Sequence, residues 1–145
     1  MQFDLADFNG FGPQSEYRYA FIATDVFSKL AFAQPLKGKT PDEAAGALNK
    51  ALGTYGIMKY AYTDMGSEFT NAFSETLRRS MVKHITSRTP AAFVERLIRT
   101  VKSGIRERQE ALPGTLWWRL LEPVIKQYTS ENKRLPKKSL TKLQS

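Results

Sequence analysis

Apolar and polar residues alternate along the first part of the chain in a pattern typical of β-strands. Residues 2–8, 17–24 and 30–36 each carry aromatic or aliphatic residues at strand spacing, and short turn-forming segments separate them. Short connections between consecutive strands favour antiparallel pairing. We therefore expect these three strands to form an antiparallel meander.

From residue 40 onward, helical and strand patterns alternate. Thr40, Pro41 and Glu43 predict a helix start, with Thr40 as the cap and a helix that runs to Leu52. The other expected elements are a buried strand over 57–63, a helix over 71–80 capped by Thr70, a strand over 82–86, a helix over 91–111, and a helical stretch over 116–128 that Pro123 kinks or restarts. This order predicts an α/β fold with a mixed five-stranded sheet flanked by helices. The strand over 57–63 should pair in parallel with the first strand through a right-handed crossover.

Composition narrows the class of protein. A chain of 145 residues has the size of one ordinary domain, and it contains no Cys, which excludes a thiolate nucleophile and a Cys-based zinc site. No apolar run approaches the ~20 residues of a membrane helix, and the first residues do not resemble a signal peptide. We expect a soluble protein, and a cytosolic or nuclear setting fits. The Lys-rich segment 132–145 is predicted to be loop or disordered.

Charge is distributed unevenly between the two halves of the chain. The net charge is +8, and residues 1–72 hold 6 Lys/Arg against 8 Asp/Glu, whereas residues 73–145 hold 16 Lys/Arg against 6 Asp/Glu. A one-sided basic excess is typical of a protein that binds a phosphate backbone. It favours a nucleic-acid partner over a merely solubilising surface.

Three carboxylates lie on three separate predicted elements. Asp4 lies inside the first strand, Asp64 lies just past the end of the strand over 57–63, and Glu95 lies on the long helix. Ligand sites in such sheets lie near the carboxyl ends of the strands, so Asp4 and Asp64 can be neighbours in space. Three acids in a basic chain indicate a metal site that acts on nucleic acid.

The helix that carries Glu95 has one polar and one apolar side. At 100° per residue, Arg99, Lys102 and Arg106 all lie within about 40° of Glu95, and the apolar residues lie opposite. The three bases could follow a phosphate backbone. The alternative is an exposed face on which Glu95 pairs with Arg99, an interaction of only ~0.3–0.5 kcal/mol.

Four other polar residues are weaker candidates. Asp7 is predicted to point to the strand face opposite Asp4, and Asp25 to serve a hairpin turn. For Glu68 we expect capping or solvent exposure more than a hydrogen bond near the site. His84, the only histidine, is interpreted as structural rather than as a base.

Several segments resemble the catalytic core of the integrase superfamily, which includes retroviral and retrotransposon integrases and those of Maverick/Polinton-type DNA transposons. The resemblance extends from Gln2 to about Tyr128. The similar segments are Gln2–Leu5, Asp25–Lys29, Pro35–Thr40, Thr63–Phe69 (the family's "T-D-x-G-x-E/N-F") and Glu95–Lys102 ("E-R-x-x-R-T-x-K"). Each is weak alone, and their order along the chain makes the resemblance specific.

The resemblance implies a ribonuclease-H-like fold, an integrase catalytic core over 1–131 and a basic tail over 132–145. It implies that Asp4, Asp64 and Glu95 form a catalytic triad that holds two Mg²⁺ or Mn²⁺ ions and supports 3′-end processing and strand transfer of DNA. It also adds Arg96 to Arg99, Lys102 and Arg106 as DNA-binding residues. The implied partners are double-stranded DNA, as element ends and as target, and further copies of the chain in a homodimer or higher multimer. The implied location is nuclear, or intracellular in association with a virion or transposon.

Two alternatives remain open at this point. The chain could be a nuclease of the same fold that cuts without joining, or a domesticated, non-catalytic module for DNA binding or assembly. The intact acidic trio argues against the second alternative, because a binding role would tolerate Asn or Ala at these positions. The spacing between Asp64 and Glu95 is shorter than is usual in the family, and this difference falls in the loop before the long helix.

Overall fold

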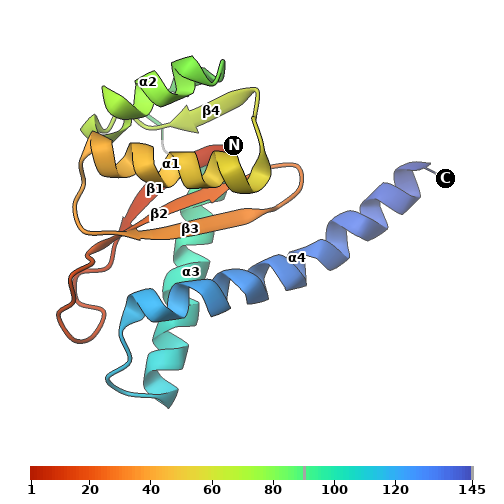
Figure 1. The fold of residues 1–145 in the computed structure, drawn as a ribbon. Coiled ribbons are helices and arrows are strands. Elements are labelled where there is room, and N and C mark those ends of the chain that lie inside the picture. Colours follow the sequence, from red (N-terminus) through yellow and green to blue (C-terminus); the bar gives the residue numbers. More distant parts are fainter. Residues whose placement is uncertain (90, 145) are drawn as a thin grey trace.

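The first strand of the chain lies at the centre of a five-stranded sheet. The computed structural model describes residues 1–89 and 91–144, with side chains described as far as Asn132. The strands are β1 (Gln2–Asp7), β2 (Tyr19–Thr24), β3 (Ala31–Leu36), β4 (Tyr60–Thr63) and β5 (Lys83–Thr86). Their order in the sheet is β3-β2-β1-β4-β5 (Figure 1).

Pairing in the sheet is antiparallel on one side of β1 and parallel on the other. β1 pairs with β2, and β2 with β3, in antiparallel fashion. β1 pairs in parallel with β4, and β4 with β5. The predicted mixed sheet, with the meander and the parallel crossover strand next to β1, is thereby confirmed.

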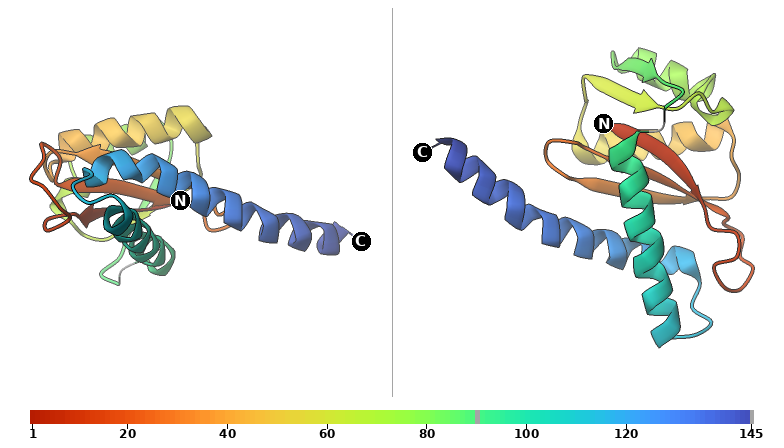
Figure 2. Two further views of the ribbon diagram at one scale, coloured as in Figure 1. Left: turned by 90° about the horizontal axis from the view of Figure 1, so that it is seen from below. Right: turned by 180° about the vertical axis from the view of Figure 1, so that it is seen from behind.

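Helices cover both faces of the sheet. They are α1 (Pro41–Tyr55), α2 (Ala72–Arg79), α3 (Ala92–Ala111) and α4 (Leu121–Gln144), with 3-10 turns η1 (Ser67–Phe69) and η2 (Trp117–Leu120). α1 and α2 pack together over one face, α3 packs against β1 and β2 on the other, and α4 packs against β3. Seen from behind, α3 crosses the strands beside β1, and α4 extends away from the sheet (Figure 2). Of the helices that the structure describes, none is long and apolar enough to cross a membrane.

The face under α1 and α2 is packed mainly by phenylalanine. Phe3 and Phe21 project from adjacent strands toward Phe73 of α2, and the Phe3 and Phe73 ring centroids lie 6.0 Å apart in an edge-to-face arrangement. Phe69 from η1 adds a fourth ring, 5.1 Å from that of Phe73. Each of these side chains is fully buried. Phe73 therefore joins the sheet to the turn that follows Asp64.

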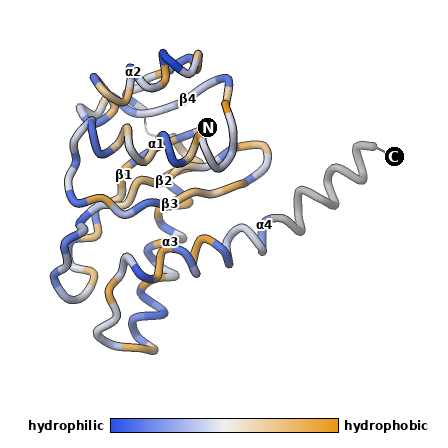
Figure 3. The backbone as a smooth tube through the Cα atoms, viewed as in Figure 1, coloured by the Kyte–Doolittle hydropathy of each residue, from blue (hydrophilic) through white to orange (hydrophobic). Residues whose placement is uncertain are grey.

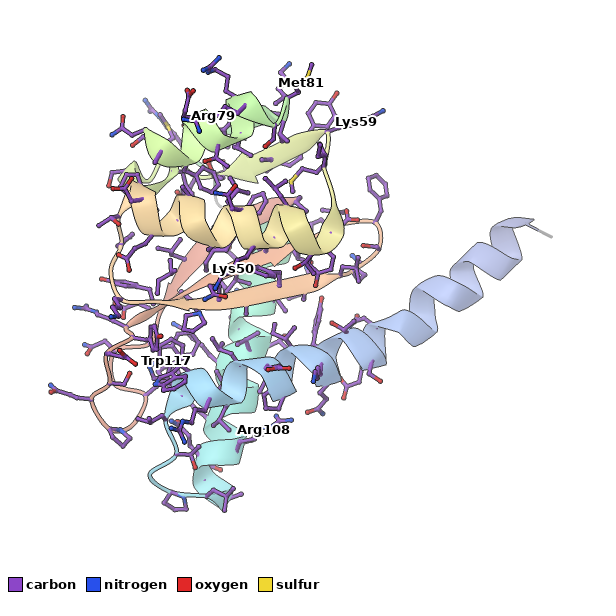
Figure 4. The ribbon with its side chains drawn as sticks, in the orientation of Figure 1. Lys50, Lys59, Arg79, Met81, Arg108 and Trp117 are labelled. Atoms are coloured by element: carbon purple, nitrogen blue, oxygen red, sulfur yellow. The ribbon has the colours of Figure 1, made fainter. Side chains whose placement is uncertain are left out.

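The opposite face has a separate core between the sheet and α3. Val101 and Ile105 are fully buried there against Ala6 and Ile22. Trp117 closes the lower end of this core, where η2 leads into α4 (Figure 4), and its ring stacks on Phe8 with a centroid distance of 4.2 Å. Along the backbone, hydrophobic positions are concentrated in the strands and are interrupted by hydrophilic ones in the helices (Figure 3). Such amphipathic helices are expected where one side faces a sheet.

The helix starts agree only in part with the prediction. Thr40 caps α1, because its Oγ1 accepts a hydrogen bond from the Glu43 amide at 3.3 Å. The Glu43 carboxylate accepts bonds from the amides of Lys37 and Gly38, so it also closes the turn before the helix. Thr70 does not cap α2: its hydroxyl donates to the carbonyl of Ser67 instead.

Two other predictions are corrected. The strand expected over 57–63 begins only at Tyr60, and Ile57, which is 74% exposed, lies in the loop between α1 and β4. The segment from Asn132 to Gln144, expected to be loop or disordered, continues α4 as helix. Lys, Leu and Gln have good helix propensity, so a Lys-rich composition does not by itself separate a helix from a loop. The domain boundary at residue 132 stays a prediction.

A buried and an exposed phenylalanine give a matched test of the core. We expect Phe73→Ala to lower the free energy of unfolding by about 3–5 kcal/mol, because it removes a ring that three others contact. Phe27→Ala should change it by less than about 0.5 kcal/mol, because the Phe27 side chain is 91% exposed. Urea unfolding followed by circular dichroism measures both, and equal losses would contradict this account of the core.

Candidate active site

The pairing of β1 with β4 brings two of the predicted acids to the same level of the sheet. Gln2 is the parallel partner of Tyr62, so two residues further along each strand Asp4 comes level with Asp64. Asp64 is the first residue after β4 and lies at its carboxyl end. Asp4 and Asp64, 60 positions apart in sequence, therefore lie at the same level of neighbouring strands.

Gln2 connects the third acid to the same place. Its side-chain Oε1 accepts a hydrogen bond of 3.0 Å from the backbone amide of Val94, in the first turn of α3. α3 has no side-chain cap of its own, since Ala91 occupies the cap position, so Gln2 satisfies one of its free amides. Glu95 directly follows Val94. The bond therefore holds Glu95 beside the strand that carries Asp4.

Asp4 lies in an environment that disfavours its charge. Burial raises the pKa of the Asp4 carboxyl to about 6, against the opposing effect of the Leu5 amide, which donates to Oδ1 at 2.8 Å. The negative charges of Asp64, Glu68 and Glu95 raise the same pKa further. Each of these three carboxylates is thus close enough to Asp4 to repel it.

Glu68 is the functional candidate that the sequence interpretation missed. We expected capping or solvent exposure, but the residue is only 2% exposed. Its Oε1 lies 4.0 Å from Nζ of Lys39, an ion pair that joins the turn after β4 to the segment before α1. The prediction of exposure is wrong because η1 is held down by Phe69, the buried residue that follows Glu68.

Gly66 allows Asp64 and Glu68 to approach the same point. The Gly66 amide donates to Oδ1 of Asp64 at 2.8 Å. A Cβ atom placed on Gly66 would lie 2.9 Å from that same oxygen and would also collide with the Glu68 carboxylate. The sequence motif already contained this glycine. The positions of the two carboxylates explain why a residue without a side chain is needed there.

The kind of ligand at this site suits a hard divalent cation, although the ligand set is not preassembled. Within residues 1–89 and 91–132, whose side chains are described, no group of three or more His, Asp or Glu side chains is close enough to hold a metal ion. Asp4 and Asp64 each hold a backbone amide instead. Carboxylate oxygens that repel one another are nevertheless the donors that Mg²⁺ prefers.

The four predicted DNA-binding residues lie on two sides of α3. Lys102 and Arg106 stand over aromatic rings next to the β1–β2 connection, with the Arg106 guanidinium 4.3 Å from the Phe11 ring centroid. Arg96 and Arg99 line two cavities between α3 and α4, of about 170 and 340 Å³. The basic residues therefore form a surface broader than the single stripe predicted.

The weaker candidates have structural partners. Asp7 pairs with Arg18 at 3.2 Å, and this hydrogen-bonded guanidinium lowers the pKa of Asp7. Asp25 serves its turn, as predicted, by accepting from the Ser28 hydroxyl at 2.7 Å. His84 lies 2.7 Å from Oγ1 of Thr63, and burial lowers its pKa.

Comparison with solved structures agrees with this geometry. A dimeric form of the HTLV-2 integrase catalytic core domain, in complex with magnesium, superposes with a TM-score of 0.68 and 22% identity over 88% of this chain and 81% of that one. The BIV integrase catalytic core gives a TM-score of 0.71 and 18% identity over 86% of this chain and 78% of that one. A chain of the simian T-cell lymphotropic virus intasome, solved with a PP2A regulatory subunit, gives 0.71 and 20% over 88% and 45%. The chain has the fold of a retroviral integrase catalytic core.

The integrase-core fold confirms the ribonuclease-H-like architecture expected from the resemblance. No protein-family model matches the sequence, and no curated protein is significantly similar to it. At 18–22% identity, the likeness to integrase cores is one of fold. The assignment of site residues in this chain therefore has to come from its own geometry.

Gly66 and Gly46 provide a matched pair of glycine substitutions. We expect Gly66→Ala to lower the free energy of unfolding by about 1–3 kcal/mol, because the new methyl group would overlap two carboxylates. Gly46→Ala should raise it by about 0.5–1 kcal/mol, because Gly46 lies on an exposed face of α1 with open space around it. Thermal or urea unfolding measures the difference, and a neutral Gly66→Ala would show that the turn has room to relax.

The raised pKa of Asp4 predicts a pH dependence of stability. Because folding shifts this pKa from 3.8 to about 6, the stability contributed by protonated Asp4 is fully present below pH 3.8 and is lost as the pH rises through about 6. In the absence of metal, we expect the free energy of unfolding of the wild type to show this decrease as the pH rises. The Asp4→Asn variant should not show it. Urea titrations in EDTA across this range measure both, and parallel pH profiles would refute the assignment.

Proposed function

We propose that this protein is the catalytic core of a DNA integrase or transposase, which trims 3′ ends and joins them to target DNA. The observation that carries the proposal is the convergence of Asp4, Asp64 and Glu95, from β1, the end of β4 and α3, in a chain with the integrase-core fold. Asp64 and Glu95, each tens of residues from Asp4 in sequence, both repel its carboxylate, and a cation would offset that repulsion.

The proposed cofactor is Mg²⁺ or Mn²⁺, with two ions per site. Asp4, Asp64 and Glu95 would hold these ions. When bound, such ions would stabilise the charge on the attacking and leaving oxygens of an in-line displacement at phosphorus. The HTLV-2 core was solved in complex with magnesium, which supports the choice of cation here.

The side chains of this protein would hold the carboxylate set together and orient the DNA. Glu68 and Gly66 shape the turn that presents Asp64, and Gln2 anchors the turn that presents Glu95. The nucleophile is a water in end trimming and the 3′-hydroxyl of the trimmed end in joining. Neither reaction needs a covalent link between protein and DNA.

The basic residues of α3 would bind DNA phosphates. Arg96, Arg99 and Arg106 are exposed, and Lys102 is half-buried along the same helix. Contacts of this kind position a duplex and carry little sequence preference. The proposed partner is double-stranded DNA, both element ends and target, and the net charge of +8 supports it.

We also propose that the chain acts as a homodimer or higher multimer, in the nucleus or in association with a virion or transposon. Support comes from the compared integrases, one of which is a dimeric form and another part of an intasome.

A non-catalytic DNA-binding module is the second candidate function. One observation favours it: in the residues with described side chains, the acids do not form a preassembled metal-ligand group. A nuclease of the same fold is a variant of the main proposal that lacks the joining step. Both differ from an integrase in the products they leave.

The test is strand transfer of a labelled duplex with recessed 3′ ends into supercoiled plasmid, in Mg²⁺ or Mn²⁺. We expect joined products from the wild type, and at least about a 100-fold lower rate for Asp64→Asn or Glu95→Gln, since each removes part of several kcal/mol of charge stabilisation. Glu110→Gln, an exposed change in the last turn of α3, is the control.

The products separate the candidates. Nicked plasmid without joined DNA would identify a nuclease. Duplex binding with neither cutting nor joining, and no change in Asp64→Asn, would identify the non-catalytic module and overturn the proposal.

A further inference from the structure

On the sheet face that carries Asp4, the main helix contacts are with β1, β2 and β3. α3 packs on β1 and β2, and α4 packs on β3, so these helices leave β4 to one side (Figure 2). Tyr60 and Tyr62 of β4 are 44% and 38% exposed. Their rings lie 6.2 Å apart at an angle of 37°. Two large aromatic side chains thus stand next to each other on an open strand.

The exposed tyrosines lie on the same face as the candidate active site. Tyr62 is the strand partner of Gln2, and Gln2 and Asp4 project to one side of β1, toward α3. Asp64 follows Tyr62 by two residues. A strand of nucleic acid that leaves the carboxylates along β4 therefore meets Tyr62 first and Tyr60 next.

Positive charge borders the tyrosine pair at its far end. Lys83 is the β5 partner of Tyr60, and the Lys83 amide donates to the carbonyl of Lys59 at 3.0 Å, so the two lysines are neighbours. Both side chains are exposed, and Lys59 points outward at the corner where β4 begins (Figure 4). Lysine is depleted in the cores of protein–protein interfaces, so this border fits a phosphate chain better than a second copy of the protein.

Next to the tyrosines is a cavity of about 400 Å³, lined mostly by apolar side chains that include Phe27 and Ile57. Asp25 is the one carboxylate among the residues that line it. That carboxylate already accepts bonds from the Ser28 hydroxyl and the Phe27 amide. The surface thus offers aromatic faces, an apolar recess and two exposed lysines.

We infer that the open face of β4 binds unpaired nucleotides, with bases stacked on Tyr62 and Tyr60 and phosphates near Lys59 and Lys83. Aromatic side chains bind single strands through stacking, which is insensitive to base identity, whereas paired bases within a duplex have no free faces. This inference rests on the proposed function, because trimming a 3′ end leaves an unpaired overhang on the other strand. Tyr62 lies two residues from Asp64 in sequence, so such an overhang could reach the face directly from the carboxylates.

The test is fluorescence anisotropy with a short labelled oligothymidylate and with a blunt duplex, in EDTA so that no catalysis contributes. We expect Tyr60→Ala and Tyr62→Ala each to weaken oligothymidylate binding about tenfold and to leave duplex binding unchanged. Tyr60→Phe and Tyr62→Phe keep the ring and should bind like the wild type. Leu112→Ala, at a 66% exposed apolar site at the far end of α3, is the control.

Three outcomes would overturn the inference. The first is equal oligothymidylate affinity in the Ala and Phe variants. The second is an equal loss for oligothymidylate and duplex, which would indicate a general effect on charge or folding. The third is a change in sedimentation of the Ala variants, which would make the face an interface between copies. Because binding is measured without metal, a failure of strand transfer in the preceding assay is distinguishable from a failure here.

Discussion

The parallel pairing of β1 with β4 is the constraint on which the rest of the structure depends. It joins the antiparallel meander to the parallel half of the sheet, and it does so with a register that brings Asp4 level with Asp64. A shift by one residue would turn Tyr62 toward the phenylalanine core and Ala61 toward α3. The same register thus keeps Tyr62 out of that core and places Asp64 level with Asp4.

The carboxylates around Asp4 lower the stability of the fold by electrostatic repulsion. Asp4 is partly desolvated and is repelled by three other carboxylates, and Glu68 is buried with its nearest cation 4.0 Å away. Burying like charges together is unfavourable unless a counter-ion is present. The surrounding aromatic core, with Phe69 and Phe73 packed beneath the turn, holds this arrangement in place.

Much of this architecture could be predicted from residue patterns, because periodicity and turn chemistry are local. The meander, the helix cap at Thr40 and the parallel crossover all follow from them, and they are confirmed. Exposure was harder to predict. Tyr60 and Tyr62 look like core residues in sequence, and their exposure follows from where α3 crosses the sheet, a tertiary fact that no local pattern encodes.

The prediction that Glu68 is exposed was wrong for the converse reason: long-range packing buries it. A glutamate beside a turn usually faces water, and only the packing of Phe69 together with the missing side chain of Gly66 shows that this one does not. The placement of Glu95 likewise required a contact between residues 92 positions apart, Gln2 and Val94. Sequence patterns identified the acids as candidates, and long-range contacts decide how they meet.

The central position of β1 also has a consequence for biosynthesis. Of the described strands, β1 comes first in the sequence, and two of the elements that contact it come much later, since β4 begins at Tyr60 and α3 at Ala92. While the ribosome is still translating, the nascent meander exposes an unpaired edge and two uncovered apolar faces. Such intermediates are prone to associate. The high sequence separation of the closing contacts also places this chain among slowly folding topologies.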